Sequence, residues 1–209
     1  MTTHPAGNPQ PYPPQPGVHN PYAQQPQPQP QPPQSGPVAG PAERGKGATV
    51  LLLVSTILLG LMAGLFFAFD VSVMPGLAEA DDRTYVTAMQ NFNAAIDGNP
   101  LFGMAFMIAL LLPVVSAILE YRKGRRDVAV WVAVGAVLYF IVLMITFSVN
   151  IPLNNELADA GNAAKMTDFS IVDKFKTTWV TTNILRTLLC TVALTALSRA
   201  LVLYGRATR

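Results

Sequence analysis

Four long stretches without charge constrain this 209-residue chain more than any other feature. Residues 48–69 and 128–149 each give 22 uncharged, mainly apolar residues, and residues 101–119 give 19. A fourth stretch, 179–203, is mainly apolar and carries two charges, those of Arg186 and Arg199. A helix of 22 residues is about 33 Å long, which matches the hydrocarbon thickness of a bilayer. The sequence therefore predicts an all-α fold, an integral membrane four-helix bundle with spans at about 48–69, 101–119, 128–149 and 179–203.

The first 47 residues differ from the rest in composition. They hold 14 of the 18 prolines, many of them alternating with glutamine, and no charged residue before Glu43. Such a segment cannot bury enough apolar surface to offset its ordering entropy, so it is predicted to be a disordered, cytoplasmic tail. The chain divides into this Pro/Gln-rich tail, 1–47, and a membrane domain, 48–205. Its Pro-x-x-Pro spacings leave docking to a partner open beside a purely flexible extension.

Basic residues are distributed unevenly between the two ends of the predicted spans. They cluster before the first span, in the 120–127 link and after the fourth span. The two loops at the other end, 70–100 and 150–178, hold four basic residues against nine acidic ones. Because basic residues favour the cytoplasmic side, the chain is predicted to be a multi-pass plasma membrane protein with both termini in the cytoplasm.

The first of the two outer loops is predicted to contain a short amphipathic helix at about 82–96. Its apolar residues Tyr85, Met89, Phe92 and Ile96 repeat at helical spacing. Asp82 is a suitable cap at its start, and a glycine follows its end. This helix is expected to cover the bundle.

The inventory of reactive side chains excludes several kinds of site. The two histidines, His4 and His19, both lie in the tail, and Cys190 is the single cysteine. A cysteine-based zinc site, histidine-ligated haem and Ser-His or Cys-His catalysis are therefore excluded from the membrane domain, and no metal or cofactor is expected there. The net charge of +2 gives no reason to expect nucleic acid as a partner.

Polar residues near the outer ends of the spans are the candidate site. Arg186 lies about 10 Å along the helix axis from Trp179 and is therefore expected within the hydrocarbon, facing the bundle and paired with Asp70. Asp70 and Arg186 are the candidate catalytic residues, although both also fit a purely structural role. The candidate ligand-binding residues gather from spans three and four: Asn150, Asn154, Trp179, Asn183 and Arg186.

Several motifs together resemble a known family. They are Val-Met-Pro-Gly-Leu at 73–77, Ala-Met-Gln-Asn-Phe-Asn at 88–93, Asn-Pro at 99–100, Asn-Ile-Pro-Leu-Asn-Asn-Glu-Leu at 150–157, and Trp179 followed by Asn183 and Arg186. Over roughly residues 50–205 the chain resembles the anthrone oxygenase-like family of small four-span bacterial membrane proteins, long described as a domain of unknown function. The resemblance implies a four-helix membrane bundle. Fungal relatives oxidise anthrones to anthraquinones with molecular oxygen and without a cofactor.

Three functions follow as hypotheses. In the first, the outer polar cluster of an uncharacterised membrane protein binds a small hydrophobic ligand or a membrane partner. In the second, the protein is a cofactor-free oxygenase of polycyclic phenols, with Asp70 as base, Arg186 as cation and the asparagines as hydrogen-bond donors. In the third, which the sequence favours least, four spans form a transporter as a homo-oligomer; the spans lack the broken-helix symmetry of such proteins.

Overall fold

The computed structural model describes residues 1–2, 17 and 45–208. The predicted disorder of the tail falls almost entirely outside the described residues. Residues 45–208 form helices joined by short turns, and this part of the chain contains no strand. The elements in chain order are α1 (Lys46–Ala68), η1 (Phe69–Val73), α2 (Met74–Ala78), α3 (Asp82–Asp97), α4 (Pro100–Arg122), α5 (Arg126–Ile145), η2 (Thr146–Asn150), α6 (Ile151–Asp159), η3 (Ala163–Lys165), α7 (Ser170–Lys174), η4 (Phe175–Trp179) and α8 (Val180–Ala207).

The four predicted spans are confirmed. Four continuous helices are long and apolar enough to cross a membrane: Lys46–Ala78, Pro100–Arg122, Arg126–Asp159 and Ser170–Ala207. Three of them have 33 to 38 residues and exceed the roughly 20 residues that a bilayer requires. Each of these three includes a π-helical segment, η1, η2 or η4, at the junction between its membrane part and its extension.

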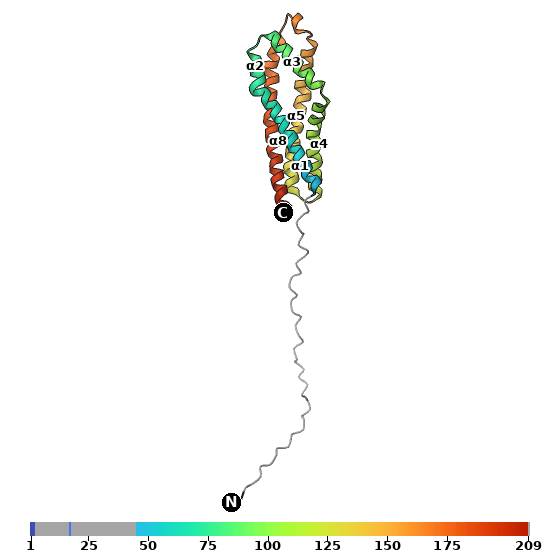
Figure 1. The fold of residues 1–209 in the computed structure, drawn as a ribbon, viewed down its shortest axis with the longest axis vertical. Helices are drawn as coiled ribbons and strands as arrows, with labels where there is room; N and C mark the ends of the chain where they lie inside the picture. The colour runs from blue at the N-terminus through green and yellow to red at the C-terminus, as the bar shows by residue number, and fades with distance from the viewer. Residues whose placement is uncertain (3–16, 18–44, 209) are drawn as a thin grey trace. The chain divides into compact units, whose positions relative to one another are not determined.

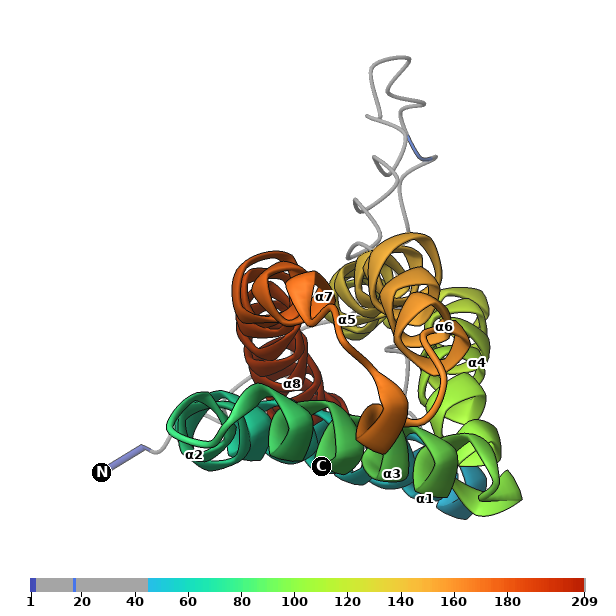
Figure 2. The ribbon, with the colours of Figure 1, turned by 90° about the horizontal axis from the view of Figure 1, so that it is seen from above.

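The long helices form a ring in which α1 and α5 each pack between α4 and α8 (Figures 1 and 2). The core of this ring is apolar, with Leu59, Tyr139 and Leu197 fully or almost fully buried. At Gly135 of α5, an added Cβ would lie 3.2 Å from the carbonyl oxygen of Ala193. Close approach of α5 and α8 therefore depends on that glycine.

The extensions and α3 build a second apolar core at one end of the ring, which we call the cap. Tyr85, Met89, Leu157 and Phe175 are completely buried in it. The predicted amphipathic helix is α3, and it covers the bundle as expected. Asp81 rather than Asp82 is its N-cap, because the Asp81 side chain accepts a hydrogen bond from the backbone N–H of Thr84 at 3.0 Å. A hydrogen bond from the Thr84 hydroxyl and, after it, this backbone bond lower the pKa of Asp81.

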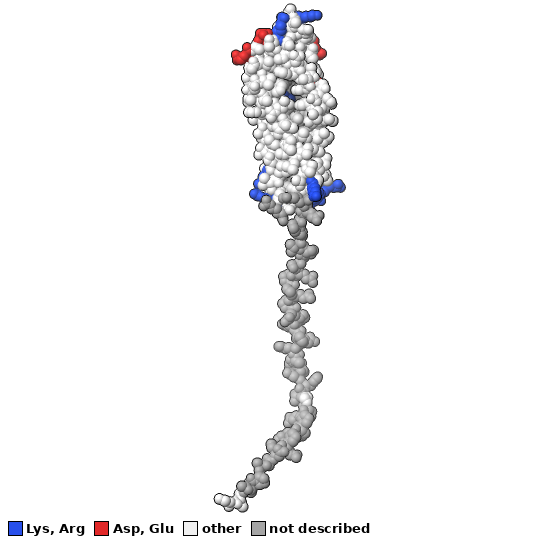
Figure 3. Space-filling model, viewed as in Figure 1, with Lys and Arg blue, Asp and Glu red and all other residues white. Residues whose placement is uncertain are grey.

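On the face that Figure 3 shows, charged side chains lie at the two ends of the helical unit, with a belt of uncharged surface between them. The end opposite the cap, which we call the link end, carries the short turn between α4 and α5. There Glu120, which is 1% exposed, forms an ion pair with Arg125, and this partner raises the pKa of Arg125. The belt shows that the bundle is built for a bilayer. Which end faces the cytoplasm stays a prediction.

Candidate functional site

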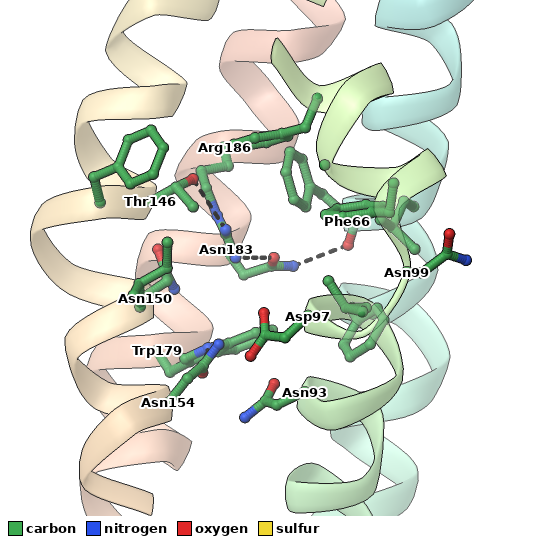
Figure 4. A pocket seen from close by; sticks show the side chains of 18 of the residues that line it. Phe66, Asn93, Asp97, Asn99, Thr146, Asn150, Asn154, Trp179, Asn183 and Arg186 are labelled. Carbon is green, nitrogen blue, oxygen red and sulfur yellow. Dashed lines mark hydrogen bonds between the residues drawn. The ribbon is translucent and has the colours of Figure 1, made fainter. Parts of the chain in front are cut away.

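The bundle contains a cavity of about 330 Å³ just below the cap. Its walls are mostly aromatic and aliphatic, and its polar groups come from α3, η2, α6, η4 and α8. Figure 4 shows Arg186 toward one end of this space and Asn93 and Asn154 toward the other. The lining residues are Leu65, Phe66, Phe69, Asn93, Ile96, Asp97, Asn99, Pro100, Phe102, Gly103, Phe106, Met107, Thr146, Phe147, Asn150, Ile151, Asn154, Trp179, Asn183 and Arg186.

All three π-helical segments lie at the level of the cavity and contribute side chains to it. Phe69 comes from η1, Asn150 from η2 and Trp179 from η4. Pro75 and Pro152 each follow one of these segments by two residues, and a proline cannot donate to the carbonyl four residues before it. The preceding turn therefore widens, and π-helical turns of this kind are frequent at functional sites.

Arg186 is the central polar residue and is 4% exposed. Its guanidinium donates to the Asn183 Oδ1 at 2.7 Å and to the Thr146 hydroxyl at 3.2 Å. It also lies 4.4 Å from the ring centre of Phe66 and 5.4 Å from that of Trp179. Its Nε has no hydrogen-bond partner. The cation is thus held against two aromatic rings, and its Nε–H is unpaired.

The sequence predicted a direct pair between Asp70 and Arg186. The structure shows no such ion pair. The ion pairs in the described part of the chain are Arg125–Glu120, Lys174–Glu156 and Lys176–Asp82. Asp70 instead accepts hydrogen bonds of 2.5 Å from the Asn183 amide and the Thr187 hydroxyl. Asn183 therefore connects acid and cation.

Asp70 also lies outside the wall of the cavity. Asn183, which does line the cavity, donates from its amide to Asp70 and also to the Phe66 carbonyl at 2.9 Å. A carboxylate in this place can balance the charge of Arg186, but it does not reach a molecule in the cavity.

The other predicted ligand-binding residues do line the cavity. Trp179 donates from its indole N–H to the Asn154 Oδ1 at 3.0 Å, and its ring stacks on Phe175 with centroids 6.1 Å apart. Asn150 donates to the Thr182 hydroxyl at 3.0 Å, while its Oδ1 is buried without a partner. Residues chosen from separate spans are thus brought together around one space.

Sequence reasoning missed Asp97 and gave Asn93 no role, although both line the cavity. Asn93 lies in a motif that carried the family resemblance, and its Nδ2 is buried without a partner. Asp97 is the carboxylate that borders the cavity, and no pattern in the sequence marks it. Both depend on the turn that joins α3 to α4, which brings the end of α3 over the start of the second span.

The free polar atoms indicate what the cavity can hold. Six buried side-chain atoms of the described residues have no hydrogen-bond partner, and three belong to residues of this wall: Arg186 Nε, Asn93 Nδ2 and Asn150 Oδ1. Buried polar atoms are rarely left unpaired, so these favour a ligand with oxygen atoms. The aromatic walls favour a flat, apolar body, and Arg186 can stabilise negative charge on an oxygen.

The described residues contain no group of three or more His, Cys, Asp and Glu side chains placed to hold a metal ion. Neither the curated proteins nor the solved structures gave a match to the chain. A family model for anthrone oxygenase, however, matches residues 92–196, which is half of the 209-residue chain. This range includes Asn93, Asp97, Asn150, Trp179 and Arg186. The chain therefore belongs to the anthrone oxygenase family.

Proposed function

We propose that the cavity binds a small polycyclic aromatic ketone or phenol and that the protein oxidises it with molecular oxygen, as the family name suggests. The observation that carries this proposal is the buried guanidinium of Arg186 between the rings of Phe66 and Trp179, with its Nε unpaired. A volume of about 330 Å³ lies at the small end of the usual range for ligand pockets, roughly 300–1,000 Å³.

The reaction of an anthrone illustrates what the residues would do. A base removes a proton from the ring methylene, and the negative charge moves to the ketone oxygen, where Arg186 stabilises it. The resulting carbanion carbon and a proton add to O₂ and form a C–OOH group. Loss of the remaining hydrogen on that carbon, with cleavage of the O–O bond, gives the second carbonyl and water. Anthrone and O₂ are thus converted to anthraquinone and water.

Asp97 supports this chemistry as the carboxylate that borders the cavity. Asp70, the base favoured by the sequence, is separated from the cavity by Asn183. We therefore assign Asp70 to charge balance in this proposal and Asp97 to proton removal. The Asn93 Nδ2 would donate to a further oxygen atom of the substrate, and the Asn150 Oδ1 would accept from a phenolic hydroxyl.

Binding without catalysis is the second candidate, because Asp97, the carboxylate that borders the cavity, is exposed rather than enclosed beside Arg186. One protein preparation can separate the two. Trp131 is 40% exposed on α5, so Trp131→Phe leaves Trp179 as the single tryptophan reporter beside the cavity. We expect anthrone, under anaerobic conditions in lipid nanodiscs, to quench Trp179 at lower concentration than anthracene, which has the same three rings without the oxygen.

Admitting oxygen then tests catalysis. We expect one O₂ consumed per anthraquinone formed, and Arg186→Gln should lower the rate by about 10²- to 10³-fold, as for the loss of one oxyanion donor. Empty nanodiscs measure spontaneous oxidation. Binding with an oxidation rate equal to that of empty nanodiscs would favour the non-catalytic candidate, and equal quenching by anthrone and anthracene would contradict both.

A further inference from the structure

The cavity opens on the flank of the bundle rather than at its end. Figure 3 shows a hollow in the uncharged belt, with a basic side chain at its floor, and in the matching view of Figure 1 this place lies between α1 and α4. Arg186 is the basic residue of the cavity wall. At this edge Leu65 is half-buried and Met107 is 43% exposed, and both belong to membrane-spanning helices.

The hydrogen bonds between neighbouring helices explain why this seam is open. Near the cavity, α1 and η1 are joined to α8 through Asn183 and Thr187, and η2 is joined to α8 through Arg186 and Asn150. The Tyr139 hydroxyl joins α5 to the Phe106 carbonyl of α4 at 3.0 Å. Within residues 45–208, no side-chain hydrogen bond joins α1 or η1 to α4.

The cap closes the route along the bundle axis. Its core is apolar, with Tyr85, Leu157 and Phe175 fully buried. Gln90 of α3 donates to the carbonyls of Leu157 and Gly161 at 2.9 and 2.8 Å, which fastens α3 across this end (Figure 2). A molecule arriving along the axis would have to separate these elements.

Gly103 of α4 stands at the edge of the opening. It lines the cavity, it is exposed, and a Cβ added there would meet no heavy atom within 4 Å. A larger side chain at this position therefore enters open space instead of pressing against a neighbour. We infer that ligands reach the cavity from the cap-side leaflet of the bilayer, through the seam between α1 and α4, and that the absence of a side chain at Gly103 keeps this passage wide enough for fused aromatic rings.

This inference rests on the proposed ligand site, and its first test is kinetic. The parent is the Trp131→Phe protein in nanodiscs, and stopped-flow quenching of Trp179 by anthrone without oxygen gives both rate constants. Gly103→Leu and Gly103→Phe are expected to slow association and dissociation by about tenfold or more, within the range over which association rates vary, and to leave the Kd within a factor of about three. Gly64→Phe is the matched control, because Gly64 is exposed, lies outside the cavity wall and also has open space around a Cβ.

Unchanged rates in both Gly103 variants would overturn the inference. A weaker Kd with unchanged association would also overturn it, because the new side chain would then occupy the ligand's position. Thermal unfolding confirms that each variant is folded, and Gly103→Leu serves if the phenylalanine variant is not.

A second measurement needs no ligand. Nanodiscs made with phosphatidylcholine brominated on its acyl chains should quench Trp179, which is only 6% exposed, by letting a chain into the opening. Gly103→Phe should reduce this quenching at least about twofold, and Gly64→Phe should not. If anthrone fails to bind but this difference is seen, the proposed ligand is wrong and the lateral opening stands. If anthrone binds and neither measurement responds to Gly103, the opening is wrong and the proposed function stands.

Discussion

Hydrogen bonds at both the oxygen and the nitrogen of the Asn183 amide determine its orientation. Its oxygen accepts from Arg186, and its nitrogen donates to Asp70 and to the Phe66 carbonyl. A buried charge needs compensation, and a direct carboxylate contact would also occupy the donors that a ligand requires. Asn183 allows Asp70 to compensate Arg186 from outside the cavity while the Arg186 Nε stays unpaired.

This arrangement predicts energetic coupling between two residues that do not touch. Arg186→Leu leaves Asp70 and Asn183 without their cation, so the Asp70→Asn change should cost less in the Arg186→Leu background than alone. We expect a coupling free energy of about 0.5–3 kcal/mol from thermal unfolding of the two single variants and the double variant in detergent. Asp70→Asn combined with Arg199→Leu, near the other end of α8, is the control and should be additive. Additive effects in the first pair would contradict the link through Asn183.

Arg186→Lys should separate folding from ligand binding. Lysine keeps the positive charge but lacks the planar fork that contacts Asn183 and Thr146 together and lies against Phe66. We expect the variant to remain folded, with unfolding close to that of the wild type, and its affinity for anthrone to fall at least about tenfold, as for the loss of a charged hydrogen bond. Arg199→Lys should change neither quantity. An unchanged affinity for anthrone in Arg186→Lys would contradict the proposal that binding requires the planar guanidinium.

The part of the candidate site that comes from one helix was predictable from residue spacing. Trp179, Asn183 and Arg186 follow each other at intervals of four and three residues, so a shared face was expected, and all three line the cavity. Asp97 was not predictable, because its approach to the cavity depends on the angle at which α3 meets α4. The separation of Asp70 from Arg186 depends on one amide that sequence spacing does not orient.

At the scale of single elements, the prolines after η1 and η2 mark where the helices change geometry. Pro152→Ala restores an N–H that can donate to the Ser148 carbonyl, so we expect η2 to tighten toward an α-helix and Asn150 to turn from the cavity. The affinity for a hydroxylated anthrone, whose phenolic O–H can donate to the Asn150 Oδ1, should fall by about tenfold, the effect of losing one polar contact, while thermal stability is kept. Pro113→Ala is the control, since α4 contains no π-helical segment. A loss of stability in Pro152→Ala with unchanged affinity would show that η2 serves packing.

The contact between α5 and α8 gives a second prediction at this scale. A side chain at Gly135 would meet the Ala193 carbonyl and the Leu197 side chain at 3.2 Å, and backbone cannot move aside cheaply. Gly135→Leu is expected to lower the free energy of unfolding by about 1–3 kcal/mol or more, as overpacking does. Gly64→Leu, on an open surface of α1, should have little effect in the same thermal measurement. Equal stability of the two variants would show that the helices separate easily.

For the whole molecule, the sequence predicted the four membrane crossings well because uncharged length is a direct physical requirement of the bilayer. It did not predict how far three helices continue past their apolar stretches. The sequence predicted polar loops for those extensions. In the structure, Leu157 and Phe175 are buried against α3 in the cap. Such a core depends on residues far apart in the chain, so local patterning does not reveal it. A membrane partner or a homo-oligomer stays a prediction from the sequence.

Orientation in the membrane is also a prediction. A reporter fused after Arg125, in the link between α4 and α5, should be active in the cytoplasm, and one inserted at Gly161 in the cap should report the outside. Both sites lie in turns, since Gly124 and Gly161 have positive φ angles of 76° and 81°. The opposite result would invert the topology and place the cap in the cytoplasm.

Trp179 belongs to the core of the cap, where it packs with Phe175, and it also lines the cavity. Occupancy below the cap and order within it are therefore thermodynamically linked. A ligand at 100 times its Kd stabilises the state that binds it by about 2.7 kcal/mol. The free energy needed to open the cap should rise by up to the same amount. Amide protons of α3 and α7 should then exchange more slowly with deuterium when anthrone is bound. Binding of a molecule from the lipid would thus make the cap, which lies beyond the apolar belt, more rigid.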